Sequence, residues 1–294
     1  MRRSNKAIVT LAIGDKYLND WKGTCEKNWR QYADIHQFDL VCIDQPLDES
    51  DRAKKRSPAW QKCLILGHES VRDYDTVVWI DSDILINNAI APCITDSVPV
   101  GKVGAIQMYD QPTPELYQTV LDRMYDWWGS AAVQNRTAEE YHTAYGLPAG
   151  IAQVVQTGVM VLSPTCHRQL LEKVYYDYEE KGGRQWNMEM RPLSYELLKA
   201  KCVHWIDGRF NVNWVEYMFL HYPFLLTSIP RNHALPRIRA KLKILIEGSI
   251  RRDLRRACVA NAFLSSYFLH FGGDYISDMK LLDLTARSLR ACCF

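Results

Sequence analysis

The chain has 294 residues, of which 47% are hydrophobic and 24% charged, as in ordinary globular proteins with a large core. Its formal net charge of +2 gives no indication of a nucleic acid partner, and no stretch approaches the roughly 20 apolar residues that span a bilayer. The nine cysteines are scattered and lack the spacing of a zinc site, which favours reduced thiols in a cytoplasmic protein. The first apolar run, residues 7–13, is too short for a signal peptide and predicts a core strand.

Strand and helix patterns alternate along the first two thirds of the chain. This alternation predicts an α/β fold, with helices packed on a sheet. The expected elements are a strand within 6–13, a helix over 17–35, a strand over 38–43, an exposed loop over 44–57, a helix over 57–69, strands over 77–80 and 104–108, a helix over 114–127, a strand over 154–164 and a helix over 165–180.

The last part of the chain has a different character. Residues 231–256 hold nine Lys or Arg against two acids, with Leu and Ile between them. The sequence therefore predicts a basic, mainly helical region over 231–294 that follows a catalytic domain over 1–230. Such a helix could lie on the anionic inner face of a membrane with its apolar side down. The alternative is an amphipathic helix that packs on the catalytic domain.

The most informative segment is a buried strand that ends in two acids. Residues 77–80 are apolar and mostly β-favouring, and Asp81, Ser82 and Asp83 follow at once. Open α/β sheets bind ligands at the carboxyl ends of their strands. Carboxylates there suit Mg²⁺ or Mn²⁺, which in turn can stabilise the charge of a substrate diphosphate. The alternative for Asp-Ser-Asp is a turn or a helix cap.

Four further segments carry a resemblance to a known fold. They are residues 10–17, the Trp-x-Lys of PAWQK, the sequence QTG at 156–158, and YFLHFGGD at 267–274. Together with Asp-Ser-Asp they resemble the nucleotide-sugar glycosyltransferases of the GT-A fold. The resemblance is greatest to the families of glycogenin, bacterial lipooligosaccharide galactosyltransferases and fungal α-mannan galactosyl- and mannosyltransferases. It implies a Rossmann-like, mostly parallel central sheet flanked by helices.

The resemblance also implies roles for individual residues. The segment after the first strand would hold the nucleotide, Lys62 would meet the diphosphate, and the glycines would let the donor approach the backbone. The donor-binding residues implied are Thr10, Ala12, Asp15, Tyr17, Trp60, Lys62, Asp81, Ser82, Gly158, Gly272 and Gly273.

The metal ligands implied by the resemblance are Asp81, Asp83 and His270, with Mn²⁺ or Mg²⁺ as the cofactor. His270 would return from the C-terminal region to complete the metal shell. The chain departs from the family's full C-terminal motif, because Ile276 stands where a lysine is usual.

Two residues are implied as catalytic. Glu189 falls where related enzymes place a group near the anomeric carbon, and Gln156 stands in place of the usual Asn. The alternative for Glu189 is a surface residue that caps a helix. Asp207 and Asn211 are weaker candidates for the site, with a turn at a strand end as the alternative.

The expected function is transfer of a sugar from a nucleotide-diphosphate sugar, most simply a UDP-sugar, to a glycan or glycolipid. A sugar-phosphate nucleotidyltransferase is one alternative, but the segment at 14–17 is too short and poor in glycine for its phosphate loop. A second alternative is a non-enzymatic protein that binds a membrane surface or a polyanion through the basic segment. Retention or inversion of the anomeric configuration stays open.

Overall fold

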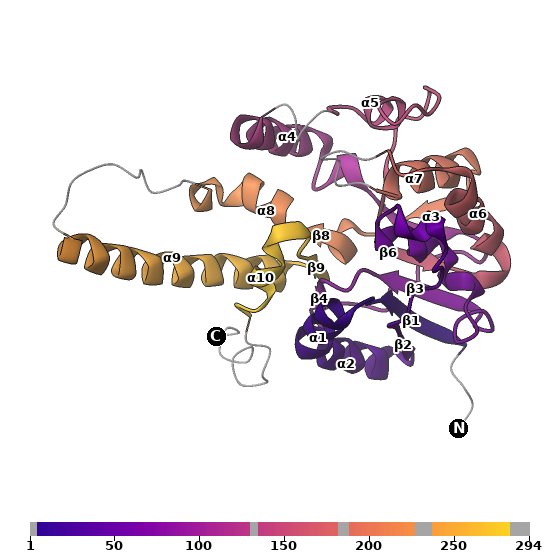
Figure 1. Cartoon of the computed structure of the whole chain (residues 1–294), viewed down its shortest axis with the longest axis horizontal. Coiled ribbons are helices and arrows are strands. Elements are labelled where there is room, and N and C mark those ends of the chain that lie inside the picture. Colours follow the sequence, from indigo (N-terminus) through magenta and orange to yellow (C-terminus); the bar gives the residue numbers. More distant parts are fainter. Residues whose placement is uncertain (1–4, 130–134, 182–187, 227–236, 283–294) are drawn as a thin grey trace.

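The computed structural model describes residues 5–129, 135–181, 188–226 and 237–282 (Figure 1). Its centre is a six-stranded sheet in which β6 runs against its two neighbours, while the pairs β1–β2, β1–β3 and β5–β7 are parallel. The sheet confirms the expected mostly parallel α/β fold. The strands in spatial order are β2 (Asp39–Ile43), β1 (Lys6–Leu11), β3 (Thr76–Ile80), β6 (Val155–Leu162), β5 (Val103–Gln107) and β7 (Val203–Trp205).

The strands are apolar because both faces of the sheet are covered. In β3, Val78 and Ile80 join one core cluster while Val77 and Trp79 join the other, as expected for side chains that alternate across a strand. All eight residues of β6 are buried. Helices pack on both faces of the sheet (Figure 1). They include α1 (Asp15–Thr24), α2 (Glu26–His36), η1 (Pro58–Gly67), α6 (Pro164–Asp177) and α7 (Met190–Lys199).

Three expectations about local structure need correction. The single helix expected over 17–35 is two helices that meet at Cys25, where Gly23 and Thr24 weaken the helix and Trp21 packs edge-on against Trp29 at 5.8 Å. The helix expected over 57–69 is the 3₁₀ helix η1, although Ser57 caps it as predicted. The loop over 44–57 contains α3 (Asp51–Lys54), and its Arg56 is buried against the ring of Trp60 at 4.6 Å.

A small second sheet connects the C-terminal part of the chain to the central sheet. Its order is β4 (Ile84–Ile86), β9 (Phe268–His270) and β8 (Val212–Asn213). Strand β4 begins directly after Asp83, and its first residue, Ile84, pairs with His270. The small sheet therefore places His270 near the end of β3. The apolar residues of β9, Phe268 and Leu269, are fully buried and hold that strand in place.

The remaining elements surround this frame. Helix α9 (Arg237–Ser265) projects from the body of the molecule (Figure 1), and its C-terminal end is anchored by Val259 and Phe263 in the core. Residues 231–236 of the basic segment lie outside the described residues. Within the described part of the chain, no helix has the length and apolar character needed to cross a membrane. The other helical elements are η2 (Met108–Asp110), α4 (Pro114–Trp128), α5 (Ala138–Thr143), η3 (Gly208–Asn211), α8 (Trp214–His221), η4 (Pro223–Leu225), η5 (Gly273–Tyr275) and α10 (Ile276–Met279).

Candidate active site

The three residues expected to bind metal meet at the carboxyl end of β3. Asp81 and Asp83 follow that strand, and His270 ends β9. The Nε2 atom of His270 lies 3.1 Å from an oxygen of Asp83 and 3.9 Å from an oxygen of Asp81. Ligand atoms from the three residues lie within 4.8 Å of one another. Two carboxylates and an imidazole at this spacing fit a divalent ion such as Mn²⁺ or Mg²⁺.

Asn211 fixes the orientation of the His270 ring. The Asn211 Oδ1 atom lies 2.9 Å from Nδ1 of His270, and because an amide oxygen only accepts hydrogen bonds, Nδ1 is the donor. This bond turns Nε2 toward the two carboxylates, which is the usual arrangement behind a metal-binding histidine. Burial by itself lowers the pKa of the His270 imidazole, but the carboxylates of Asp83 and Asp81 outweigh it and raise that pKa above its ordinary value.

The absence of a side chain at Gly158 makes room for His270 and Asn211. A Cβ atom at position 158 would lie 2.8 Å from Cε1 of His270 and 3.0 Å from Nδ2 of Asn211. The carbonyl oxygen of Gly158 also accepts the backbone N–H of Asp81 at 2.9 Å. The His270 ring therefore lies over Gly158, and the expected close approach of a sugar to this glycine stays a prediction.

We expect Gly158→Ala to weaken Mn²⁺ binding by about 10–100-fold, the range found when support behind a metal ligand is lost. The added methyl group must push the His270 ring away from Asp83, since the contact is far shorter than van der Waals distance. Calorimetric titration with Mn²⁺ measures the effect. Gly23→Ala is the control, because a Cβ there meets nothing within 4 Å. Unchanged affinity in Gly158→Ala would contradict the crowding argument.

Lys62 is a buried cation that joins two carboxylates. Its Nζ atom lies 3.0 Å from Asp81 Oδ1 and 2.8 Å from Glu189 Oε1, and it also contacts the carbonyl oxygen of Thr157 at 3.4 Å. Burial by itself lowers the pKa of the Lys62 ammonium, but the Asp81 and Glu189 carboxylates raise it above its ordinary value. All three N–H donors have protein partners. Lys62 thus connects Asp81 and Glu189, and its expected contact with a diphosphate stays a prediction.

Glu189 lies at the centre of the site and not on the surface. It is 4% exposed, and besides Lys62 it accepts a long hydrogen bond from Thr157 Oγ1 at 3.4 Å. It stands at the N-cap position of α7 without forming a capping bond, which excludes the alternative of a surface cap. The neighbouring Gln156 on β6 is also buried, and its Oε1 atom has no hydrogen-bond partner among the described residues. A buried acceptor in that state is a candidate for a ligand hydroxyl.

The residues expected to hold the nucleotide lie at the same edge of the sheet. Strand β1 is parallel to β3 with Val9 opposite Trp79, so the residues after β1 are level with Asp81. Thr10 and Ala12 are fully buried, and Thr10 Oγ1 has no partner within the described ranges. Asp15 and Tyr17 are exposed in the first turn of α1. Their contact with a nucleotide stays a prediction.

The other expected donor-binding residues divide into two groups. Gly272 and Gly273 follow His270 after Phe271, and Gly273 has a positive φ of 64° that favours glycine. Ser82 lies between the two aspartates and accepts a bond from Cys25 Sγ at 3.4 Å through its carbonyl. Trp60 lies outside the site. Its indole is completely buried and donates to Glu180 at 2.9 Å, so it supports η1 from within the core.

Sequence reasoning missed two contributors to this region. Trp79 donates its indole N–H to Asp81 Oδ1 at 2.9 Å, which fixes that carboxylate together with Lys62. Glu216 extends from α8 near His270, and a lone carboxylate within the apolar helix WVEYMFLH is the signal that could have indicated it. Asp207, in contrast, caps η3 and pairs with Arg209 at the surface, which is the structural alternative considered for it.

The raised pKa of Glu216 predicts that replacing this residue will change the stability of the protein by an amount that depends on pH. Desolvation by burial raises the pKa of its carboxyl to about 7, against weaker opposing effects from His270 and the Tyr117 hydroxyl at 3.5 Å. Because the folded pKa exceeds the unfolded one, folding favours the protonated form, and the carboxyl destabilises the fold as pH rises from about 4.5 through 7. Replacing Glu216 by Gln should thus stabilise the protein at pH 8, by on the order of 3 kcal/mol at most, but not at pH 4.5. Thermal unfolding of both proteins at the two pH values measures this. An equal difference at both would exclude the titration.

No family model and no curated protein matches this chain. Among solved structures, the chain superposes on a glycosyltransferase involved in the glycosylation of the major capsid of PBCV-1 with a TM-score of 0.50 at 13% identity, over 94% of this chain and 100% of the other. At this identity the likeness shows the fold alone. It defines the chain as a protein of the GT-A fold of glycosyltransferases, as the Asp-x-Asp segment led us to expect.

A second solved structure is the galactosyltransferase LgtC in complex with donor and acceptor sugar analogues. It superposes with a TM-score of 0.47 at 13% identity, over 97% of this chain and 99% of LgtC. That score is too low to support a further conclusion about this chain.

Proposed function

We propose that this protein is a metal-dependent glycosyltransferase that moves a sugar from a nucleotide-diphosphate sugar, most simply a UDP-sugar, to a glycan or glycolipid. The observation that carries this proposal is the cluster of Asp81, Asp83 and His270 at the carboxyl end of β3 in a GT-A fold. Open α/β sheets bind their ligands at that edge. A divalent ion held there would act as a Lewis acid toward the diphosphate.

The residues around the cluster have definite parts in this proposal. Lys62 holds Asp81 and Glu189 in fixed relative positions through its two ion pairs. The Glu189 carboxylate can then stabilise positive charge on the sugar in a retaining reaction, or accept the acceptor's proton in an inverting one. Gln156 offers its unpartnered amide oxygen to a sugar hydroxyl.

Calorimetry with a panel of nucleotide sugars, with and without Mn²⁺, tests this function. We expect Mn²⁺-dependent binding of UDP and a UDP-sugar, with slow hydrolysis of the intact sugar donor to UDP. A sugar-phosphate nucleotidyltransferase would instead form a nucleotide sugar and pyrophosphate from a nucleoside triphosphate and a sugar 1-phosphate. A protein without metal-dependent affinity for any nucleotide would contradict both enzymatic functions.

We further propose that α9 makes peripheral contact with a membrane that carries the acceptor. The favouring observation is that Ile250 and Leu254 are 61% and 43% exposed, among the exposed Arg251, Arg252 and Arg256. Apolar and basic side chains mixed on a projecting helix suit an anionic lipid surface.

Charge reversal on α9 tests the membrane contact. Each basic residue near an anionic surface contributes about 1 kcal/mol, so glutamates at 251, 252 and 256 should abolish sedimentation with anionic vesicles. Arg255 is left unchanged because it pairs with the buried Asp278. The matched control reverses Lys54, Lys55 and Arg72, which are exposed on other elements. High salt should also release the wild-type protein. A wild-type protein that stays in solution at low salt would show that α9 does not bind membranes.

A further inference from the structure

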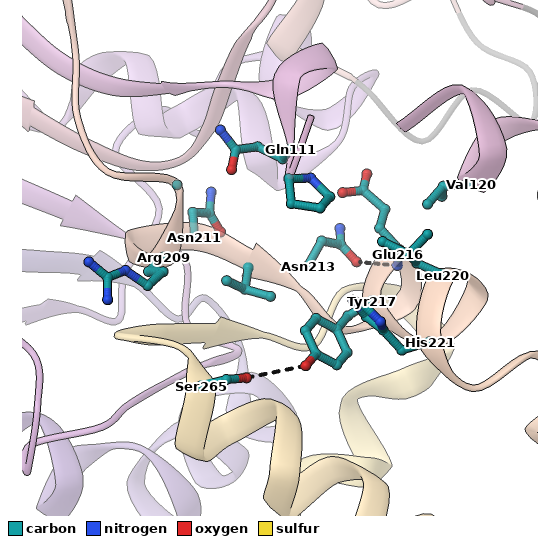
Figure 2. A pocket seen from close by; sticks show the side chains of 13 residues that line it. Gln111, Val120, Arg209, Asn211, Asn213, Glu216, Tyr217, Leu220, His221 and Ser265 are labelled. Atoms are coloured by element: carbon teal, nitrogen blue, oxygen red, sulfur yellow. Dashed lines mark hydrogen bonds between the residues drawn. The ribbon is translucent and has the colours of Figure 1, made fainter. Parts of the chain in front are cut away.

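A cavity of about 210 Å³ lies beside the metal-ligand cluster, and we refer to it as the α8 cavity. It is lined by α8, η3 and β8, by Val120 in the middle of α4, by the turn before that helix, and by the C-terminal end of α9 (Figure 2). Its volume is below the roughly 300–1,000 Å³ of pockets for drug-sized ligands, so it has room for a single ring. Residues on its wall include Gln111, Pro112, Asn211, Asn213, Glu216 and Tyr217.

The α8 cavity shares a wall with the metal-ligand cluster. Asn211 lines the cavity, and its Oδ1 atom is the partner of His270 Nδ1 at 2.9 Å. Asn213, also on the wall, stands opposite His270 in the parallel pairing of β8 with β9. A molecule in the cavity would therefore be separated from the metal ligand by one side chain.

One polar group of the wall with unused hydrogen-bonding capacity is the Glu216 carboxylate. The Nδ2 atom of Asn211 also has no partner in the described part of the chain, but it lies over Gly158 and is closed off from the cavity. The Glu216 carboxylate has the Tyr117 hydroxyl as a distant partner at 3.5 Å. Glu216, Asn211 and Gln111 all line the cavity (Figure 2). The half-buried Glu216 carboxylate can therefore accept a hydrogen bond from a ligand in the cavity.

The rest of the wall restricts the chemistry of that ligand. Pro112, Val120 and Leu220 are apolar, and the ring of Tyr217 stands at the wall with its hydroxyl 3.3 Å from Ser265 Oγ. The carboxylate of Glu216 opposes an anion, while a purely apolar ligand would desolvate Glu216 without giving it a partner. A neutral ring with hydroxyl groups on its edge and apolar C–H faces satisfies both parts of the wall.

We propose that the α8 cavity binds one sugar ring of the acceptor, with Glu216 accepting a hydrogen bond from a ring hydroxyl. This inference rests on the proposed glycosyltransferase function, and it gives the acceptor a place next to His270. Glu216 is then a binding residue that decides affinity for the acceptor and has no contact with the donor.

Two substitutions test the α8 cavity. Leu220→Trp fills it, and Glu216→Gln removes the carboxylate without changing its size. The probes are the methyl glycosides of glucose, galactose and mannose. Saturation-transfer NMR, with UDP and Mn²⁺ present, detects their binding. We expect at least one glycoside to receive saturation from the wild-type protein, a loss of that signal in Leu220→Trp, and a weakening of at least tenfold in Glu216→Gln. Affinity for UDP with Mn²⁺ should stay unchanged in both, which also shows that they fold.

Matched controls apply the same chemical changes elsewhere. Leu264→Trp alters an exposed leucine on α9 outside the wall, and Glu139→Gln alters an exposed carboxylate on α5. Wild-type saturation transfer in Leu220→Trp, or none to any glycoside from the wild type, would overturn the proposal. Failure of the underlying glycosyltransferase function is recognised separately, because UDP would then show no Mn²⁺-dependent binding.

Discussion

Replacing Asp83 by Ala is expected to abolish Mn²⁺-dependent binding of UDP and any sugar transfer while leaving the fold intact. The substitution removes one of two carboxylates from the cluster and leaves His270 Nε2 without the nearer of its two carboxylate partners, at 3.1 Å. The backbone is preserved, since the bond from Phe271 N to the carbonyl of residue 83 does not involve the side chain. Calorimetry with UDP and Mn²⁺ measures the loss, and thermal unfolding checks the fold.

Asp73→Ala is the control for Asp83→Ala, because Asp73 is an exposed aspartate that is not part of the metal-ligand cluster. It should bind UDP and Mn²⁺ as the wild type does. Chelation by EDTA should reproduce the Asp83→Ala result in the wild-type protein. Transfer that continues undiminished in EDTA would show that Asp81, Asp83 and His270 serve a purpose other than metal binding.

The sequence predicted those features of the site that depend on neighbouring residues. An apolar run followed by two aspartates identifies the end of β3, because a strand buried on both faces needs a continuous apolar run. The strand periodicity also located β1, β2, β5 and β6, and their alternation with helices gave the α/β class.

What the sequence could not predict depends on residues far apart along the chain. Lys62 has an ordinary helical context, and its buried position appears only when η1, β3 and α7 pack together so that Asp81 and Glu189 surround it. Gly158 was expected to lie beside the donor sugar. The residues next to it in the sequence give no sign that the His270 ring lies over it. The position of His270 depends on the pairing of β9 with β4. Each of these strands has three residues, which is too short for a recognisable strand periodicity in the sequence.

The second large effect is expected at Glu189. Glu189→Gln should lower turnover by roughly 10² to 10⁴-fold, the usual range for a group that moves a proton or stabilises charge at the reacting centre. Affinity for UDP with Mn²⁺ should change little, because the amide keeps the size of the side chain and Asp81 still pairs with Lys62 at 3.0 Å. Steady-state kinetics separates the two quantities, and calorimetry gives the donor affinity independently.

A control within the same helix separates catalysis from stability. Glu196 is also on α7, is also buried, and pairs with Lys173 at 2.8 Å, but its partners lie away from the metal-ligand cluster. Glu196→Gln should therefore remove a buried carboxylate from an ion pair, with a comparable loss of stability, while turnover stays near that of the wild type. If Glu189→Gln and Glu196→Gln lose stability to the same extent and both keep their turnover, Glu189 is a structural partner of Lys62, and the reacting sugar is stabilised by other groups.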